Sequence, residues 1–259
     1  MKKFLTFGIY LISSLLGLIA FLYPFVLPLA QKVGGGLQQR SDAPLLTVGL
    51  LSLCLIALLL DMQGQAVSAK IVATLGVLIA IISVLRFLET AIPGPGGFSP
   101  IFAPIILAGF VFGSRFGFLL GALTLAVSAL ITGSVGPWLP FQMFAAGWIG
   151  MGAGVLPKLR GRWQLLLLAG YGLLTGLLYG ALMNLYFWPF VAGDPATSYA
   201  VGSGVGETVR RYAVFYVATS LVWDLMRGVG NVIFIVLLGQ ATIRALQRFQ
   251  RRFVFSVEV

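Results

Sequence analysis

Histidine is absent from this chain of 259 residues, and cysteine occurs only once. Without histidine the chain has no serine–histidine or cysteine–histidine catalysis, no histidine-ligated metal or haem, and no HExxH motif. It also has no GxxxxGK[ST] motif and therefore no P-loop for ATP hydrolysis. Cys54 lies in an apolar run, where one cysteine forms neither an internal disulfide nor a cysteine-rich metal site. We therefore expect no metal site and no cofactor, and most common enzyme classes are excluded.

Charge is also scarce, at 9% of residues, against about 25% in soluble globular domains. Hydrophobic residues make up 59% of the chain. The net charge of +10 can indicate nucleic-acid binding, but here the few basic residues lie between long apolar runs. The composition therefore predicts an all-α membrane protein in a lipid bilayer, without a nucleic-acid partner.

About 20 apolar residues in a helix cross a bilayer core of roughly 30 Å. Lys2 and Lys3 precede the first run as in a signal peptide, but the run is too long and lacks a cleavage site, which favours an anchor helix. The run 101–112 is short, so it is a thin span or a re-entrant segment; the charged turn at Arg115 favours the thin span. Eight spans are predicted, at 4–29, 44–60, 69–88, 101–112, 116–131, 141–156, 163–188 and 212–248.

Basic residues near the span ends segregate to one side, which the positive-inside rule assigns to the cytoplasm. Both termini are therefore predicted to be cytoplasmic. The chain divides into two N-terminal helices (1–62), a six-helix core (63–250) and a cytoplasmic tail (251–259). Four basic residues lie on the outer side: Lys32, Arg40, Arg210 and Arg211. Eleven lie on the cytoplasmic side: Lys2, Lys3, Lys70, Arg115, Lys158, Arg160, Arg162, Arg244, Arg248, Arg251 and Arg252.

Small residues recur at four-residue spacing in two of the predicted helices. Such spacing lets membrane helices approach closely, which predicts a compact bundle. The residues concerned are Gly109, Gly113, Gly117 and Gly121, and Gly172, Gly176 and Gly180.

Ionisable and amide side chains inside the spans are predicted to meet at one depth near the outer side. Two interpretations remain open: intrahelical salt bridges with interfacial aromatic residues, or a cavity with aromatic walls and a few polar groups. The glycine- and proline-rich loops 90–100, 133–140 and 189–211 lie on the same side and can cover such a cavity. The residues expected to line it are Trp138, Gln142, Asn184, Asp224, Arg227 and Asn231, with Arg86 and Glu89 at its edge.

Residues 94–156 contain the run FGxxxGFLxGALT and the block GPWxPFQM. This stretch resembles the central part of the substrate-binding S components of energy-coupling factor (ECF) transporters. The resemblance extends more loosely over residues 69–248, the length of a six-helix S component. Residues 4–60 have no counterpart in it.

The resemblance implies a vitamin-capturing subunit that works with a transmembrane coupling subunit and two ATPase subunits. Ala69 and Ala73 match the AxxxA motif that contacts the coupling subunit, and the outer loops correspond to those that bind the vitamin. The GPWxPFQM block is closest to subfamilies proposed for cobalamin-related or other vitamin ligands. Two alternatives remain: a membrane scaffold or sensor, and a membrane enzyme acting on a lipid through Asp224, Glu89 and Arg227.

Overall fold

The computed structural model describes residues 8, 10–22, 49, 52, 69–92, 96–191, 194, 196–200 and 203–254. All regular secondary structure in these residues is helical, which confirms the all-α prediction. Of the first predicted span, the apolar helix Tyr10–Leu22 is described, whereas nearly all of 44–60 lies outside the described residues. Four described helices are long and apolar enough to cross a membrane: Lys70–Ala91, Ser114–Thr132, Arg162–Phe187 and Leu221–Arg251.

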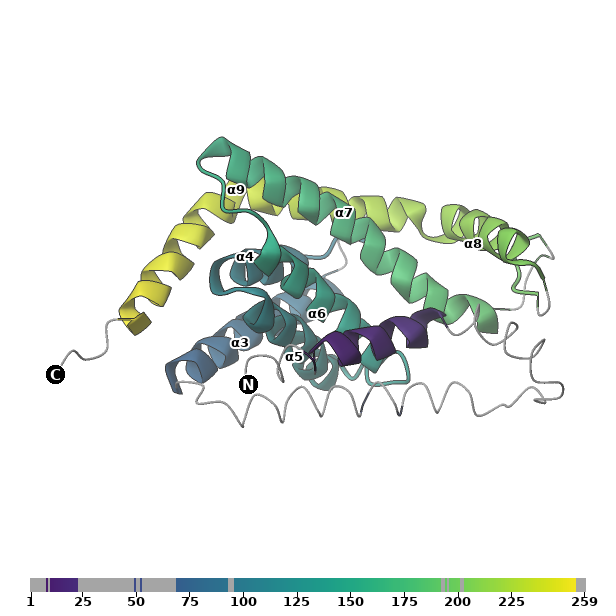
Figure 1. Ribbon diagram of the computed structural model, residues 1–259, viewed down its shortest axis with the longest axis horizontal. Helices are drawn as coiled ribbons and strands as arrows, with labels where there is room; N and C mark the ends of the chain where they lie inside the picture. Colours follow the sequence, from purple (N-terminus) through teal and green to yellow (C-terminus); the bar gives the residue numbers. More distant parts are fainter. Residues whose placement is uncertain are drawn as a thin grey trace. The chain divides into compact units, whose positions relative to one another are not determined.

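The core helices fall close to the predicted spans, because long apolar runs punctuated by glycine and proline mark their ends (Figure 1). In chain order they are α3 (Ala69–Ala91), α4 (Phe102–Phe112), α5 (Ser114–Thr132), α6 (Leu139–Val155) and α7 (Arg162–Phe187). A short 3₁₀ helix, η1 (Trp188–Phe190), comes next, followed by α8 (Val205–Thr219) and α9 (Leu221–Val254).

The prediction of one continuous last helix over 212–248 is wrong. Ser220, with φ −130° and ψ −25°, separates α8 from α9, and α9 continues to Val254. The Thr219 hydroxyl donates to the Phe215 carbonyl at 2.7 Å. A hydroxyl that bonds back to a helical carbonyl slightly destabilises and bends the helix, and this bond lies one residue before the break.

The chain forms two compact units, each described separately below. The core unit comprises Ser68–Val135, Gln142–Gly180 and Leu221–Val259. The second unit comprises Met1–Val67, Gly136–Phe141 and Ala181–Ser220.

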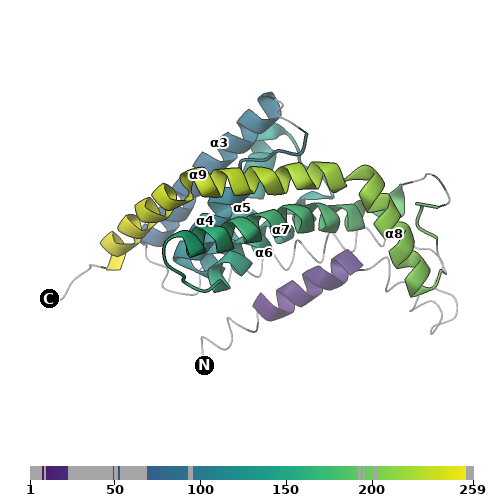
Figure 2. The ribbon, with the colours of Figure 1, turned by 90° about the horizontal axis from the view of Figure 1, so that it is seen from above.

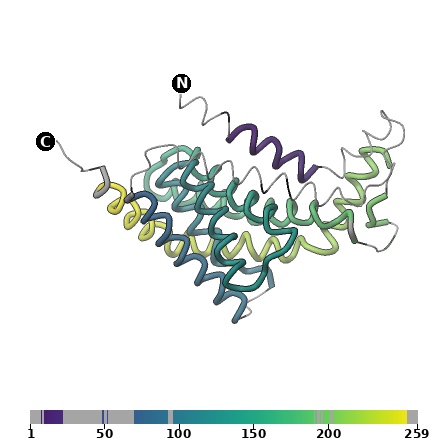
Figure 3. The backbone as a smooth tube through the Cα atoms, turned by 90° about the horizontal axis from the view of Figure 1, so that it is seen from below, coloured from purple at the N-terminus to yellow at the C-terminus, as the bar shows by residue number. Residues whose placement is uncertain are grey.

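Helix α4 is the interior element of the core unit. Eight of its residues are buried, and it is apolar on every side, as expected of a helix enclosed by others. It packs against α5 and α9, while α3 packs along α5 (Figures 2 and 3).

Glycines bring α4, α5 and α6 into backbone contact. Gly113 has φ +96°, a conformation that favours glycine, and forms the turn between α4 and α5. A side chain at Gly109 or at Gly117 would collide with the Gly150 carbonyl of α6, and one at Gly121 would collide with the Ala146 carbonyl. The predicted close approach is confirmed. Gly113 forms the turn, and its backbone also lies where a side chain at Gly154 of α6 would collide.

The C-terminus of α4 is capped by side chains from other elements. The Lys158 ammonium donates to the Phe110 carbonyl and lies 3.6 Å from the centre of the Phe110 ring. Gln250 of α9 donates from Nε2 to the Val111 carbonyl at 3.2 Å. Burial lowers the pKa of Lys158, whose positive charge suits a helix C-terminus. The 11 residues of α4 rise only about 17 Å, so the thin-span interpretation stays a prediction.

Candidate functional site

Three of the four glycines of α7, the predicted stripe Gly172, Gly176 and Gly180, face polar residues of α9. A side chain at Gly180 would collide with the Asp224 carboxylate, and one at Gly176 would meet the backbone of Arg227 and its neighbour Gly228. A side chain at Gly172 would crowd Asn231. Glycine therefore leaves room on α7 for the polar groups of α9 and exposes the α7 carbonyls to them.

Two of those carbonyls accept hydrogen bonds from α9. The Asn231 amide donates to the Gly172 carbonyl at 2.9 Å, and Asn231 is fully buried. The Arg227 guanidinium donates to the Gly176 carbonyl at 3.4 Å and also forms an ion pair with Asp224, which is 2% exposed. These contacts fix the three α9 side chains against α7.

Tyr179 of α7 is the common neighbour of the charged side chains. Arg86 and Glu89 of α3, and Asp224 and Arg227 of α9, all act electrostatically on its hydroxyl. The Arg227 guanidinium lies 5.2 Å from the centre of the Tyr179 ring. The structure therefore brings four predicted residues from two helices around a tyrosine on a third, and their formal charges sum to zero. These four residues with Tyr179 and Asn231 are called the Tyr179 cluster below.

Only one of the two predicted intrahelical salt bridges forms. Asp224 pairs with Arg227, whereas Glu89 accepts a hydrogen bond from the Ser99 hydroxyl at 2.8 Å. Arg86 and Glu89 influence one another electrostatically, but they make no ion pair among the described residues. The salt-bridge interpretation therefore accounts for Asp224 and Arg227 and leaves Arg86 unexplained.

The Tyr179 cluster contains two polar atoms whose hydrogen bonding is unmet within the described residues. These are a donor, Nε of Arg86, and an acceptor, Oδ1 of Asn231, and both atoms are buried. Burying such atoms without partners costs on the order of 1–3 kcal/mol each. A bound polar molecule that accepts from one and donates to the other would remove that cost.

The segment 96–100 packs on the N-terminal half of α9. Gly97 has φ +82° and lies against the Trp223 backbone, and a side chain at Gly96 would collide with the Trp223 ring. The Phe98 ring lies 5.6 Å from that of Phe234. Part of the loop 90–100, predicted to cover a site, therefore lies beside the helix that carries Asp224 and Asn231.

Residues 70–239 match the family model described as ECF transporter, substrate-specific component. The chain belongs to this family. It is therefore a membrane-embedded transporter subunit, as the resemblance in the sequence predicts. No curated protein and no solved structure matches the chain.

The remaining predicted site residues of this S component lie partly in the second unit. Gln142 of α6 belongs to the core unit, and its Oε1 is buried without a hydrogen-bond partner in the described residues. Trp138 is 39% exposed, and Asn184 on α7 has a buried Nδ2 that lacks a described partner. Both belong to the second unit, so their assembly with the Tyr179 cluster stays a prediction. Ala73 is exposed near the start of α3, and Ala69 begins that helix.

In the second unit, the loop predicted as a lid is organised around Trp188. This side chain is fully buried, and its Nε1 donates to the Thr197 carbonyl at 2.6 Å. The rings of Tyr199 and Tyr212 each lie 5.3 Å from its ring. Aromatic packing therefore holds part of the segment 189–211 of the S component in one conformation.

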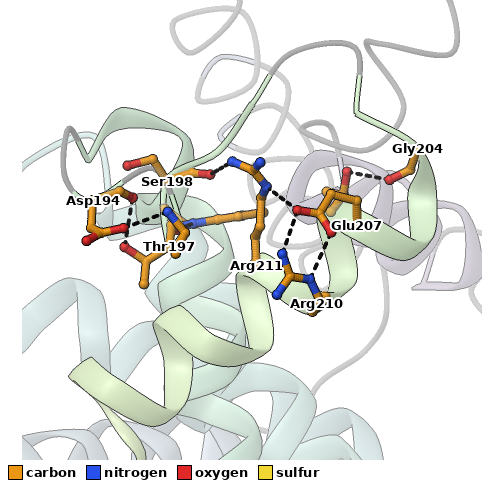
Figure 4. A network of polar contacts seen from close by, with 10 residues as sticks. Asp194, Thr197, Ser198, Gly204, Glu207, Arg210 and Arg211 are labelled. Carbon is orange, nitrogen blue, oxygen red and sulfur yellow. Dashed lines mark hydrogen bonds and ion pairs between the residues drawn. The ribbon is translucent and has the colours of Figure 1, made fainter.

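An ion network continues from this loop into α8 (Figure 4). Glu207 pairs with Arg210 and Arg211, each at 2.8 Å, and Arg211 also donates to the Ser198 carbonyl at 3.4 Å. Hydrogen bonds from the two guanidiniums lower the pKa of Glu207 to about 2. The network ties the start of α8 to the preceding turn, where Asp194 accepts from the Ala196 amide at 2.7 Å.

Sequence reasoning missed Tyr179, Ser99 and the role of Gly180. A tyrosine in an apolar run is ordinary, and Ser99 lies in a loop ten residues from its partner Glu89. One signal was available for Tyr179, since it lies between Gly176 and Gly180 of the α7 stripe.

Proposed function

We propose that this S component captures a small polar molecule at the Tyr179 cluster and delivers it through a coupling subunit driven by two ATPases. The supporting observation is the meeting of Arg86, Glu89, Asp224 and Arg227 around Tyr179. Ionisable groups inside membrane spans are costly and mark ligand or ion pathways. In a family defined by its substrate-specific role, such a cluster is best explained as the capture site.

The charges indicate which class of molecule the site takes. Two guanidiniums and two carboxylates give no net charge, so the site has no preference for a net anion or cation. The unmet donor of Arg86 and the unmet acceptors of Asn231 and Gln142 favour a ligand carrying both an acceptor and a donor. We propose a neutral or zwitterionic molecule of vitamin size; Trp138 and Asn184 remain predicted binding residues of the second unit.

Capture takes place at the outer face, with both termini in the cytoplasm, in this proposal. Ala69 and Ala73, at the cytoplasmic start of α3, provide the contact with the coupling subunit. The family match begins at residue 70, in agreement with a core that starts near residue 63 and two additional helices in 1–62.

Mass spectrometry of small molecules released by denaturing the protein purified in mild detergent tests this function. The wild type should release about one vitamin-sized compound per protein, neutral or zwitterionic, and the spectrum decides whether it is cobalamin-related. Arg86→Gln should release none, because it removes the buried Nε donor, which has no partner among the described residues. Arg160→Gln is the control, since Arg160 is an exposed basic residue outside the Tyr179 cluster.

Retention of the compound by Arg86→Gln at the wild-type level would contradict the site. A compound with net charge would contradict the proposed substrate class and leave capture intact. If the wild type is empty, uptake is measured in cells that also express a coupling subunit and ATPases. No uptake of any vitamin there would contradict the transport role.

A further inference from the structure

The last 15 residues of α9 lie beyond the part of the chain that defines the family. The family match ends at residue 239, whereas α9 continues without interruption to Val254. The 34 residues of α9 have a length of about 51 Å as a helix, and a bilayer core is only about 30 Å thick. A helix that enters the core near Leu221 therefore leaves it near residue 240. Residues 240–254 are called the α9 extension below.

One face of the α9 extension is fixed to the bundle. Ile243 is 2% exposed, and Gln250 donates to the Val111 carbonyl at the end of α4. The extension is therefore attached to the core unit at two points, two turns apart.

A second face carries exposed arginines. Arg244, Arg248 and Arg251 are spaced by four and three residues, so they follow one side of the helix, and all three are exposed. Phe249 is 46% exposed nearby. The sequence has no acidic residue between Asp224 and Glu258, so no carboxylate on the extension neutralises this face.

Basic residues also lie at the adjoining turns, outside the α9 extension. Arg115 follows the α4–α5 turn, and Arg160 and Arg162 follow Lys158, which contacts the end of α4 beside Gln250. A basic face, with an exposed aromatic ring on another side of the same helix, has the chemistry of an interfacial helix where a spanning helix leaves the core. A bilayer core about 30 Å thick would place this part of α9 at the depth of the phospholipid headgroups.

We propose that the α9 extension binds acidic phospholipid headgroups through Arg244, Arg248 and Arg251. Each basic side chain at an anionic membrane surface contributes roughly a fivefold factor to binding. Three together therefore contribute about a hundredfold, enough to hold this end of α9 at the surface. The proposal does not depend on which small molecule is captured, nor on which leaflet the extension meets.

The test uses the full-length protein in lipid nanodiscs made of phosphatidylcholine alone or with phosphatidylglycerol. Cys54→Ser removes the native thiol, and Ala245→Cys on the extension carries an environment-sensitive fluorophore. A nitroxide-labelled lipid headgroup quenches the fluorophore when the extension lies on the surface. We expect quenching to rise several-fold with phosphatidylglycerol. It should fall at high salt, because the electrostatic screening length is only about 3 Å at 1 M.

Two triple variants that lose the same number of positive charges distinguish the arginines of the α9 extension from the basic residues of the adjoining turns. Arg244→Gln/Arg248→Gln/Arg251→Gln should lose the response to phosphatidylglycerol, and Arg115→Gln/Arg160→Gln/Arg162→Gln should keep it. Equal quenching in both lipid mixtures, or equal loss in both variants, would overturn the proposal. A fluorescence change seen only when a purified coupling module is added would also overturn it, in favour of an acidic protein surface.

Discussion

At the level of single residues, the Asp224 side chain both forms an ion pair and fills space between two helices. It pairs with Arg227 on its own helix, and its carboxylate occupies the space that Gly180 leaves on α7. Removing one partner of a buried ion pair leaves an uncompensated charge and costs about 3–5 kcal/mol, whereas replacing both partners by apolar residues is often neutral. Stability and binding can therefore be separated at this pair.

We predict that Asp224→Ala loses both ligand and stability, whereas Asp224→Leu/Arg227→Met loses the ligand alone. In detergent, the free energy of unfolding of the double variant should lie within about 1 kcal/mol of the wild-type value, because its apolar pair replaces the ion pair. Thermal unfolding and mass spectrometry of released compounds measure the two effects. A double variant that still carries its ligand would show that the pair serves packing only.

Glu207 gives a prediction for pH. Its pKa in the folded chain, about 2, lies below its ordinary value of 4.5. A lowered folded pKa means that the ion network stabilises the fold above pH 4.5 and that this contribution is lost as pH falls toward 2. Hydrogen exchange in α8, corrected for intrinsic rates, should stay slow to about pH 4 and accelerate below it. Glu207→Gln should exchange fast at every pH, and a wild-type profile in this variant would contradict the assignment.

At the level of helices, contacts through glycine determine how α4, α5 and α6 pack. The Gly150 carbonyl is the atom that a side chain at Gly109 or Gly117 would strike, so the three helices share one point of closest approach. Such contacts replace the hydrophobic driving force that is absent between helices in lipid.

Gly117→Ala should destabilise the core unit by at least about 1–3 kcal/mol, as expected of overpacking against rigid backbone. Gly170→Ala on α7 is the matched control, because a side chain there meets nothing within 4 Å. It should be neutral or stabilising by up to about 1 kcal/mol, since alanine favours a helix over glycine. Thermal unfolding in detergent compares the two, and equal melting temperatures would contradict the proposed contact.

The helices of the core unit were predictable because their apolar runs are long and their ends carry glycine or proline. The division at Ser220 was not, since one serine after a threonine is a weak local signal that occurs inside many helices. The site shows the same limit. Asp224 and Arg227 pair within a turn and follow from spacing, whereas Glu89 bonds to Ser99 in a loop. Such a contact depends on where the loop packs.

At the level of the whole molecule, α3 is the most exposed of the long core helices. Ala73 is exposed, as are Val77, Ile81 and Val84 further along α3. A small residue in a bulky apolar face leaves a shallow site into which a partner helix can fit. This arrangement suits the proposed contact with the coupling subunit.

Ala69→Trp combined with Ala73→Trp should abolish uptake and leave ligand capture unchanged, because the bulk would block a partner helix far from the Tyr179 cluster. Ile71→Trp is the control, since Ile71 is exposed on the other side of α3. Uptake in cells with the coupling module, alongside ligand release from purified protein, separates the two steps. Normal uptake in the double variant would remove the coupling role.

The enclosed position of α4 has a consequence for how the protein is made. We expect α4 to enter the membrane as a pair with α5, joined at Gly113, because its 11 residues rise only about 17 Å. The Val111 carbonyl near its C-terminus gains the hydrogen bond from Gln250 only after about 140 more residues have been synthesised. A contact at the centre of this transporter subunit therefore forms only after α9 has been translated.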